Sequence, residues 1–222
     1  MTAPATEVTP SCPLCCSGNG REYSRDDRRR YLHCTSCGLV FVPREQLLSE
    51  GDEKKRYDLH RNGPDDDGYR TFLQRLVGVM EPHLAPRSSG LDFGSGPEPL
   101  LSRLFEEAGH RMELYDRFYA PHLQAFERQY DFIVASEVVE HLRDPRQELD
   151  RVWSCLSPGG LLGIMTRPVV SRDEFPRWYY KNDLTHIRFF SPGTFRWLAL
   201  RWGASLEFAE EDIALLGKGG HR

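Results

Sequence analysis

Apolar residues in the C-terminal two-thirds of the chain follow two spacings, one typical of helices and one typical of strands. Residues 69–80 carry apolar side chains three and four positions apart, which predicts an amphipathic helix. A short apolar run at residues 91–93 predicts a strand, and helical spacing returns in residues 100–105, with Gly109 as a stop. A second strand is expected at residues 111–115. The alternation predicts an α/β domain.

The same alternation continues toward the C-terminus. Residues 146–156 predict a helix, and the apolar run 161–165 predicts a buried strand. Ser191 is a capping residue type and precedes another helical pattern. Two short runs, 204–208 and 213–216, predict a closing pair of strands. An antiparallel closing pair distinguishes this sheet from a purely parallel dinucleotide-binding sheet.

Composition divides the chain into three segments. Residues 1–43 hold five of the six cysteines and two apolar runs, 31–34 and 39–42, which predict strands of a small module. Residues 44–68 are mostly polar, and residues 69–222 carry the α/β pattern. An α/β domain uses about 150–200 residues, so a chain of 222 residues leaves room only for a small additional module.

The polar segment 44–68 has two interpretations. Its many charged side chains predict a solvated linker between the module and the α/β domain. Tyr57, His60 and Asn62 stand among these charges, and such residue types can also form a lid over a neighbouring pocket.

Overall composition narrows the class of protein. Hydrophobic residues make up 39% and charged residues 28% of the chain, which fits a folded globular protein. We find neither an apolar run of about 18 residues nor a signal-peptide pattern, and we expect a cytoplasmic protein with no membrane partner. The formal net charge of −4 argues against a general nucleic-acid coat protein, and no DNA partner is expected.

One segment departs from this acidic balance. Residues 166–202 hold seven basic and three acidic side chains. Such a surplus suits an anionic acceptor, such as a phosphorylated metabolite or RNA. A solvated helix surface would give the same composition.

Four cysteines form two CxxC pairs, Cys12 with Cys15 and Cys34 with Cys37, separated by eighteen residues. Each CxxC turn can direct two thiolates at one point, and two turns complete a tetrahedron around Zn²⁺. Gly38 follows the second pair, where such a turn often needs a positive φ. The alternative is that these cysteines are free or disulfide-bonded. Disulfides are disfavoured in a reducing compartment. The spacing therefore predicts a zinc-ribbon-like module.

The most informative motif is a glycine turn between a strand and a helix. Gly94, Ser95 and Gly96 follow the strand at 91–93, and glycines there let the backbone approach a ligand closely. Asp116 ends the next strand about twenty residues later, where a carboxylate accepts hydrogen bonds from ribose hydroxyls. Asp92 precedes the turn and can hold a cationic group or order water. The sequence predicts a nucleotide-type cofactor.

These motifs resemble those of class I S-adenosylmethionine-dependent methyltransferases. Residues 91–96 resemble the first motif of that family and Asp116 its ribose-binding acid, while residues 130–145 and 156–166 resemble its fourth strand with the following loop and its turn into the fifth strand. The resemblance covers about residues 57–217. It implies a Rossmann-like sheet, S-adenosylmethionine as cofactor, and a cleft lined by Ser136, Glu137 and Val138.

A further segment and two departures refine this resemblance. An Asp-Leu-Thr-His segment ending at His186 resembles one uncharacterised branch of the family, whose members often carry an N-terminal cysteine module. Glu98 replaces the third glycine of the family's loop. Only fourteen residues separate Asp116 from Asp131, too few for a helix and a third strand. The third strand is therefore expected to be missing from the sheet edge, which leaves no obvious residue to contact adenine.

Three residues are candidates for catalysis. His186 lies between the fifth strand and the last helix, in a segment rich in aromatic and basic residues, and can act as a general base or position the acceptor. Asp183 can orient its imidazole, although an Asp-x-Thr-His turn with local side-chain bonds is the structural alternative. His141 follows the fourth strand and either contributes to the chemistry or pins the loop.

The sequence predicts an S-adenosylmethionine-dependent methyltransferase with a zinc-binding module, acting on a small molecule or RNA. An alternative is an adaptor protein, in which the zinc module binds a partner and the cofactor domain is not catalytic. The retained glycine turn and Asp116 argue against an inactive cofactor site. A nicotinamide-dependent oxidoreductase is disfavoured because Pro97, Glu98 and Pro99 replace the small residues that a pyrophosphate requires.

Overall fold

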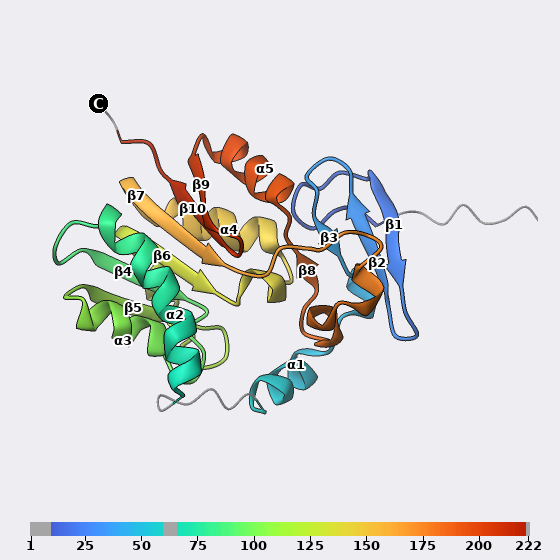
Figure 1. Ribbon diagram of the computed structural model, residues 1–222, viewed down its shortest axis with the longest axis horizontal. Helices are drawn as coiled ribbons and strands as arrows, with labels where there is room; N and C mark the ends of the chain where they lie inside the picture. The colour runs from blue at the N-terminus through green and yellow to red at the C-terminus, as the bar shows by residue number, and fades with distance from the viewer. Residues whose placement is uncertain (1–9, 60–65, 221–222) are drawn as a thin grey trace, which may run out of the picture.

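The computed structural model describes residues 10–59 and 66–220, and its centre is a six-stranded sheet (Figure 1). The strand order is β5-β4-β6-β7-β10-β9, with the first four strands parallel and the last two antiparallel. This order confirms the predicted Rossmann-like sheet with a closing antiparallel pair. The bounds are Ser89–Phe93 (β4), Arg111–Tyr115 (β5), Tyr130–Ser136 (β6), Leu156–Met165 (β7), Ser205–Glu210 (β9) and Ile213–Gly217 (β10).

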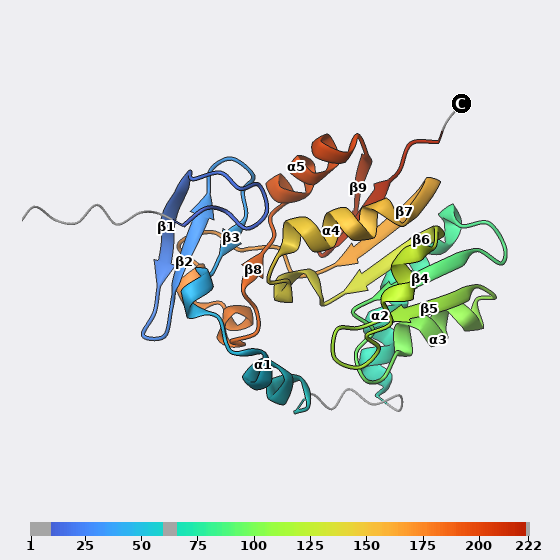
Figure 2. The ribbon, with the colours of Figure 1, turned by 180° about the vertical axis from the view of Figure 1, so that it is seen from behind.

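Four helices cover the two faces of this sheet. Residues of β6 alternate in direction: Phe132 and Val134 pack with α2 and α3, whereas Ile133 and Ala135 pack with α4 and α5. Figure 1 shows α2 in front of the sheet, and Figure 2 shows α4 in front on the opposite face. The bounds are Asp67–Met80 (α2), Leu100–Glu107 (α3), Pro145–Ser154 (α4) and Pro192–Trp202 (α5). No helix in the described ranges is long and apolar enough to cross a membrane.

The edge at β5 confirms the predicted loss of the third strand. All residues between β5 and β6 are described, and they contain only a short 3-10 helix, Leu123–Glu127, and an isolated bridge between Asp116 and Ala120. The chain thus returns from β5 to β6 without adding a strand beyond β5.

The cysteine-bearing segment forms a second, antiparallel sheet with the order β1-β2-β3-β8. Its strands are Gly20–Arg25 (β1), Arg30–Cys34 (β2), Val40–Phe41 (β3) and Arg188–Phe189 (β8). β8 comes from the chain between β7 and α5, and Figures 1 and 2 both show it beside β3. Leu14 and Leu39 belong to the same apolar core as Ile133 and Phe190. The N-terminal module therefore shares one sheet and one core with the rest of the protein.

The segment expected as a solvated linker contains an ordered helix, α1 (Glu50–Tyr57), capped by the Ser49 side chain, which accepts from the Asp52 amide at 3.1 Å. Some of its charges have partners far away in the chain, which the sequence does not reveal: Glu53 pairs with Arg143. His60 and Asn62, the other residues of the lid hypothesis, lie outside the described residues. Short 3-10 helices complete the structure at Arg44–Gln46, Glu81–His83, Val139–His141, Phe175–Arg177 and Tyr179–Asn182.

Candidate functional site

The glycine turn after β4 is held in a conformation that only glycine adopts without strain. Gly94 has φ +83°, and its amide donates to the Tyr115 carbonyl oxygen at 2.7 Å. A Cβ atom on Gly94 would lie 2.4 Å from the Val138 side chain. Gly96 has φ +66°, and a Cβ there would meet no heavy atom within 4 Å. The turn is therefore packed against the chain on one side and open on the other.

Asp116 fixes the open side of this turn. Its Oδ2 accepts from the Gly96 amide at 3.0 Å, and its Oδ1 accepts from the amides of Phe118 and Tyr119 at 2.8 and 3.0 Å. A carboxylate has about four lone-pair positions, so further donors can still bind it. Asp116 thus joins the ends of β4 and β5 and remains part of the cavity wall.

Asp92 lies behind the turn and does not line the cavity. Its side chain is buried, and its Oδ2 accepts from the Ser102 hydroxyl at 2.8 Å. Burial raises the pKa of the Asp92 carboxyl to about 6. Asp92 therefore connects β4 to α3, and any effect on a ligand passes through the glycine turn.

A cavity of about 290 Å³ opens at the carboxyl ends of β4, β5 and β6. We call one wall the glycine-loop side; its residues are Gly94, Ser95, Gly96, Asp116, Ser136 and Val138. We call a second set of lining residues the histidine side; it comprises Glu53, Tyr57, Glu137, His141 and His186. The predicted cofactor-binding and catalytic residues therefore meet in one cavity, except Asp92 and Asp183, which do not line it.

Helix α1 contributes Glu53 and Tyr57 to the histidine side. Glu53 is almost completely buried and accepts from Nε and Nη2 of Arg143 at 2.9 and 2.8 Å. A second attachment joins the Tyr119 hydroxyl to Asp58 at 2.7 Å. The Tyr57 ring packs edge-on against the His141 ring, with centroids 5.3 Å apart. These contacts hold α1 against the cavity.

The two histidines lie side by side with their Nδ1 atoms turned toward backbone. Nδ1 of His141 lies 3.0 Å from the Thr185 carbonyl oxygen, and Nδ1 of His186 lies 2.7 Å from the Tyr180 carbonyl oxygen. The ring centroids are 4.8 Å apart. Burial, together with the neighbouring His141, lowers the pKa of His186 to about 3. His186 is therefore a neutral imidazole at physiological pH.

Asp183 is engaged with Thr185, the residue that also contacts His141. Its Oδ1 accepts from the Thr185 amide and hydroxyl at 2.9 and 2.7 Å. Although burial raises the pKa of Asp183, these hydrogen bonds hold it below its ordinary value. The sequence analysis expected Asp183 to orient His186; in the structure the Tyr180 carbonyl oxygen binds Nδ1 of His186, and Asp183 orders the surrounding turn.

Two carboxylates lie beside the histidines. Glu140 is fully buried, and it accepts from the Tyr180 hydroxyl at 2.6 Å and from the Thr166 hydroxyl at 2.9 Å. Glu137 accepts from the same Tyr180 hydroxyl at 3.2 Å. Burial raises the pKa of Glu137 to about 8 and that of Glu140 to about 7. Sequence reasoning placed Glu137 in the cofactor cleft and gave Glu140 no role.

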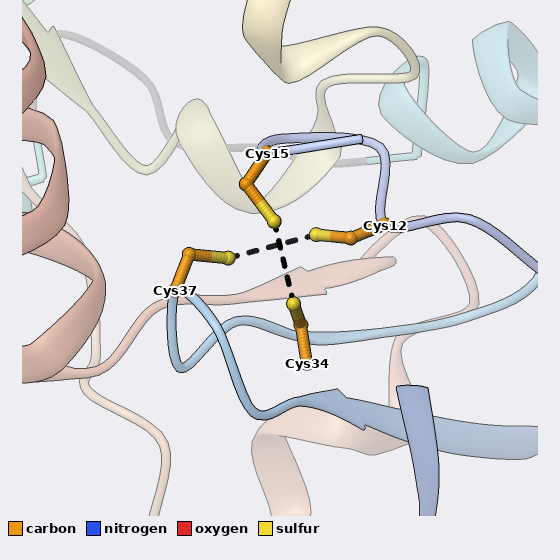
Figure 3. A group of neighbouring side chains, drawn as sticks. All are labelled: Cys12, Cys15, Cys34 and Cys37. Atoms are coloured by element: carbon orange, nitrogen blue, oxygen red, sulfur yellow. Dashed lines mark hydrogen bonds between the residues drawn. The ribbon is translucent and has the colours of Figure 1, made fainter. Parts of the chain in front are cut away.

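The four cysteines predicted as metal ligands converge on one point, and Figure 3 shows their sulfur atoms facing each other. The Sγ atoms of Cys12 and Cys37 are 3.6 Å apart, and those of Cys15 and Cys34 are 3.4 Å apart. A disulfide would need about 2.05 Å. Sulfur ligands at about 2.3 Å from one Zn²⁺ lie about 3.8 Å apart in a tetrahedron, close to the observed spacing. The arrangement fits Zn²⁺.

The basic residues of segment 166–202 do not form one anion-binding face. Lys181 pairs with Asp26 at 3.0 Å, and Arg201 pairs with Asp150 at 2.7 Å. Arg188 is buried and donates to backbone carbonyl oxygens. Much of the local positive charge is therefore used inside the fold.

Several cavity residues had no signal in the sequence. Glu53, Tyr69 and Tyr119 line the cavity, but each lies in a segment that reads as polar surface or as a core helix. Of the α1 and aromatic residues that line the cavity, only Tyr57 was indicated by the sequence, because it is an aromatic residue in a charged segment. The others reach the cavity through long-range packing, which spacing along the chain does not reveal.

Comparisons with known proteins agree with this arrangement. A family model described as a methyltransferase domain matches residues 65–207. A 1,6-didemethyltoxoflavin-N1-methyltransferase from Burkholderia thailandensis, solved with bound 1,6-didemethyltoxoflavin and S-adenosylhomocysteine, has a similar fold. Its TM-score is 0.58 at 14% identity, and 90% of this chain and 99% of that chain are covered.

A second similar structure is an O-methyltransferase family protein from the same organism, with TM-score 0.50, 13% identity, and 76% and 63% of the two chains covered. At such identities the likeness concerns the fold. The search of curated proteins gave no match.

Proposed function

This chain belongs to the class I S-adenosylmethionine-dependent methyltransferases, and on that premise we propose that it methylates a small-molecule acceptor bound at the histidine side of the cavity. One observation carries the proposal: the glycine turn, Asp116 and the histidine pair line a single cavity. The cofactor would then lie on the glycine-loop side, with its methyl group directed toward the histidine side.

The glycine-loop side suits the cofactor. The Ser95 hydroxyl is buried without a hydrogen-bond partner among the described residues, so a ligand that offers a polar group would satisfy it. The space beside Gly96 is open, and Asp116 retains lone pairs for ribose hydroxyls. When bound, S-adenosylmethionine supplies an electrophilic methyl group on sulfur. Ser136 and Val138 would complete this wall, and Asp92 would support it from behind.

The histidine side would receive the acceptor. Nε2 of His186 is the ring nitrogen left to interact with it, because Nδ1 is bound to the Tyr180 carbonyl oxygen. The low pKa of this imidazole makes positioning of the acceptor a better role than general base catalysis, which works best with a pKa near the operating pH. His141 and Asp183 would shape the same pocket.

The cysteine cluster would bind one Zn²⁺ with a structural role. Four thiolates give a closed tetrahedral site without an open position for substrate. Cys12, Cys34 and Cys37 are buried in the same core as β6 and α5. Zinc would therefore stabilise the N-terminal sheet and, through β3 and β8, the segment that carries His186.

Isotope transfer tests this function. Purified protein is incubated with S-adenosylmethionine labelled in its methyl group and with cell extract separated into small-molecule, RNA and protein fractions. We expect label in the small-molecule fraction, and none with the Gly94→Ala variant, whose Cβ would meet Val138. Label confined to RNA or protein would reject a small-molecule acceptor, and no transfer to any fraction would favour the adaptor alternative.

A further inference from the structure

A second group of metal-ligand side chains lies at the cavity, apart from the cysteines. Ligand atoms of Glu140, His141 and His186 all lie within 4.8 Å of one another. Glu140 and His141 come from the 3-10 turn after β6, and His186 precedes β8. Ligands at about 2.1 Å from one ion lie roughly 3 to 4 Å apart. The three side chains are therefore close to the spacing that a shared ion requires.

Both imidazoles turn the same ring nitrogen, Nδ1, toward a backbone carbonyl oxygen. A carbonyl oxygen only accepts hydrogen bonds, so Nδ1 carries the proton in His141 and in His186. In this tautomer Nε2 is the ring nitrogen that can coordinate an ion, and Nε2 of His141 lies 3.9 Å from Oε1 of Glu140. Metal-binding histidines typically donate their other ring N–H to a carbonyl or carboxylate, which fixes the tautomer and the ring.

Glu140 is positioned in the way expected of a ligating carboxylate. The hydroxyls of Tyr180 and Thr166 each donate to one of its oxygens, which fixes the carboxylate plane while leaving lone pairs on both. Its side chain is completely buried. Among the described residues, no lysine or arginine forms an ion pair with it, so a cation would supply the missing positive charge.

Glu137 adds a second carboxylate at the same place. It shares the Tyr180 hydroxyl with Glu140, and its Oε1 is buried without a hydrogen-bond partner in the described part of the chain. An ion at the three-residue cluster would give this oxygen a partner, either directly or through a bound water. The two carboxylates and two imidazoles together match the oxygen and nitrogen ligands of first-row divalent ions.

We propose that Glu140, His141 and His186 bind one first-row divalent cation, with Glu137 completing the charge of the site. The inference rests on the proposed function for its consequence: His141, His186 and Glu137 line the cavity on the acceptor side. Three protein ligands leave coordination positions open, as in catalytic rather than structural metal sites. With Nε2 of His186 bound to the ion, this histidine positions the acceptor through the ion, and the acceptor class is one that offers an oxygen donor, such as a hydroxyl or carboxylate group.

Mn²⁺ is the appropriate probe because it prefers oxygen and imidazole ligands and competes poorly for a four-thiolate site. Zinc-loaded protein is titrated with Mn²⁺, and the paramagnetic resonance signal of the free ion measures binding. We expect one bound Mn²⁺ per chain, and an affinity at least roughly tenfold weaker in His186→Gln and Glu140→Gln. His83→Gln is the matched control, because His83 is exposed and distant in sequence from the cluster.

S-adenosylhomocysteine binding, measured on the same samples, separates the outcomes. The substituted proteins should still bind it, which verifies that they are folded. No Mn²⁺ binding by the unsubstituted protein up to about 1 mM, or equal binding by all variants, overturns the metal site. If S-adenosylhomocysteine binds while Mn²⁺ does not, only this inference fails. If the unsubstituted protein binds no S-adenosylhomocysteine, the proposed function fails.

Discussion

The two sides of the cavity are built in different ways. The glycine-loop side is made of strand ends that lie next to each other in one sheet, and its key contacts join residues of adjacent strands, such as Gly94 and Tyr115. The histidine side is made of segments brought together from across the chain: α1, the turn after β6, and His186 in the segment leading into β8. Its contacts include Glu53 with Arg143 and His141 with Thr185.

This difference suggests that the two sides of the cavity have different functions. The glycine-loop side follows a pattern shared by the fold, which suits a constant cofactor. The histidine side depends on α1 and on the segment joined to the N-terminal sheet, and both lie outside the alternating strand–helix units. We therefore expect the largest losses of cofactor affinity from substitutions on the first side, and mainly changes in acceptor handling from substitutions on the second.

The largest effect is expected from the cysteines, because they support the histidine side through β3 and β8. Cys34→Ser should lower bound zinc from about one per chain to nearly none and lower Tm by roughly 10 °C, from a loss of at least ~3 kcal/mol at about 2–4 °C per kcal/mol. Metal analysis and thermal unfolding measure both. Cys16→Ser is the control, since Cys16 is exposed and outside the cluster. A zinc-free Cys34→Ser protein of unchanged Tm would contradict the structural role.

Gly94→Ala should have the next largest effect, confined to the glycine-loop side. The new Cβ would lie 2.4 Å from Val138, at a φ of +83°. Together these cost about 2–4 kcal/mol, so affinity for S-adenosylhomocysteine should fall about a hundredfold. Calorimetric titration measures the affinity. Gly18→Ala, where a Cβ meets nothing within 4 Å, should leave it unchanged. Equal affinity in the two variants would place the cofactor elsewhere.

Asp116→Ala should weaken S-adenosylhomocysteine binding by roughly ten- to a hundredfold, because it removes charge-assisted hydrogen bonds worth about 1.5–3 kcal/mol. Part of this loss would come from the Gly96 amide, which Asp116 holds at 3.0 Å. Asp116→Asn, which keeps one acceptor oxygen, should lose less. The same titration compares them, and full affinity in the alanine variant would assign the ribose contact to another residue.

The smallest effect on cofactor affinity is expected from α1. Glu53→Gln weakens the buried pair with Arg143, so α1 should detach more often and affinity should fall on the order of three- to tenfold. Limited proteolysis of segment 44–68 should quicken in parallel. Glu50→Gln removes an exposed pair with Arg117 and should change neither, because such pairs contribute about 0–1 kcal/mol. Equal behaviour of the two variants would show that α1 does not close the cavity.

Local patterns account for what the sequence predicted well. The turn at residues 94–96, the closing strands β9 and β10, and the short path from Asp116 to Asp131 are all encoded in contiguous residues. The family pattern could then supply their order in the sheet. The clustering of the four cysteines could be predicted for the same reason, because each CxxC turn is itself a local structure.

Long-range packing accounts for what the sequence did not predict. α1 reads as a linker because the Arg143 that neutralises Glu53 lies ninety positions away. β8 is a two-residue strand with no visible period, and its partner is β3 in the N-terminal segment. The role assigned to Asp183 depended on its closeness to His186 in sequence, whereas a backbone carbonyl oxygen, which has no sequence signature, binds Nδ1 of that ring.

The most direct test of the division between the two sides is one calorimetric comparison of S-adenosylhomocysteine binding by the unsubstituted protein, Gly94→Ala and His186→Gln. The account predicts one site per chain in the unsubstituted protein, affinity within about twofold in His186→Gln, and a loss of about a hundredfold in Gly94→Ala. Equal losses in both variants, or no binding by the unsubstituted protein, would contradict it.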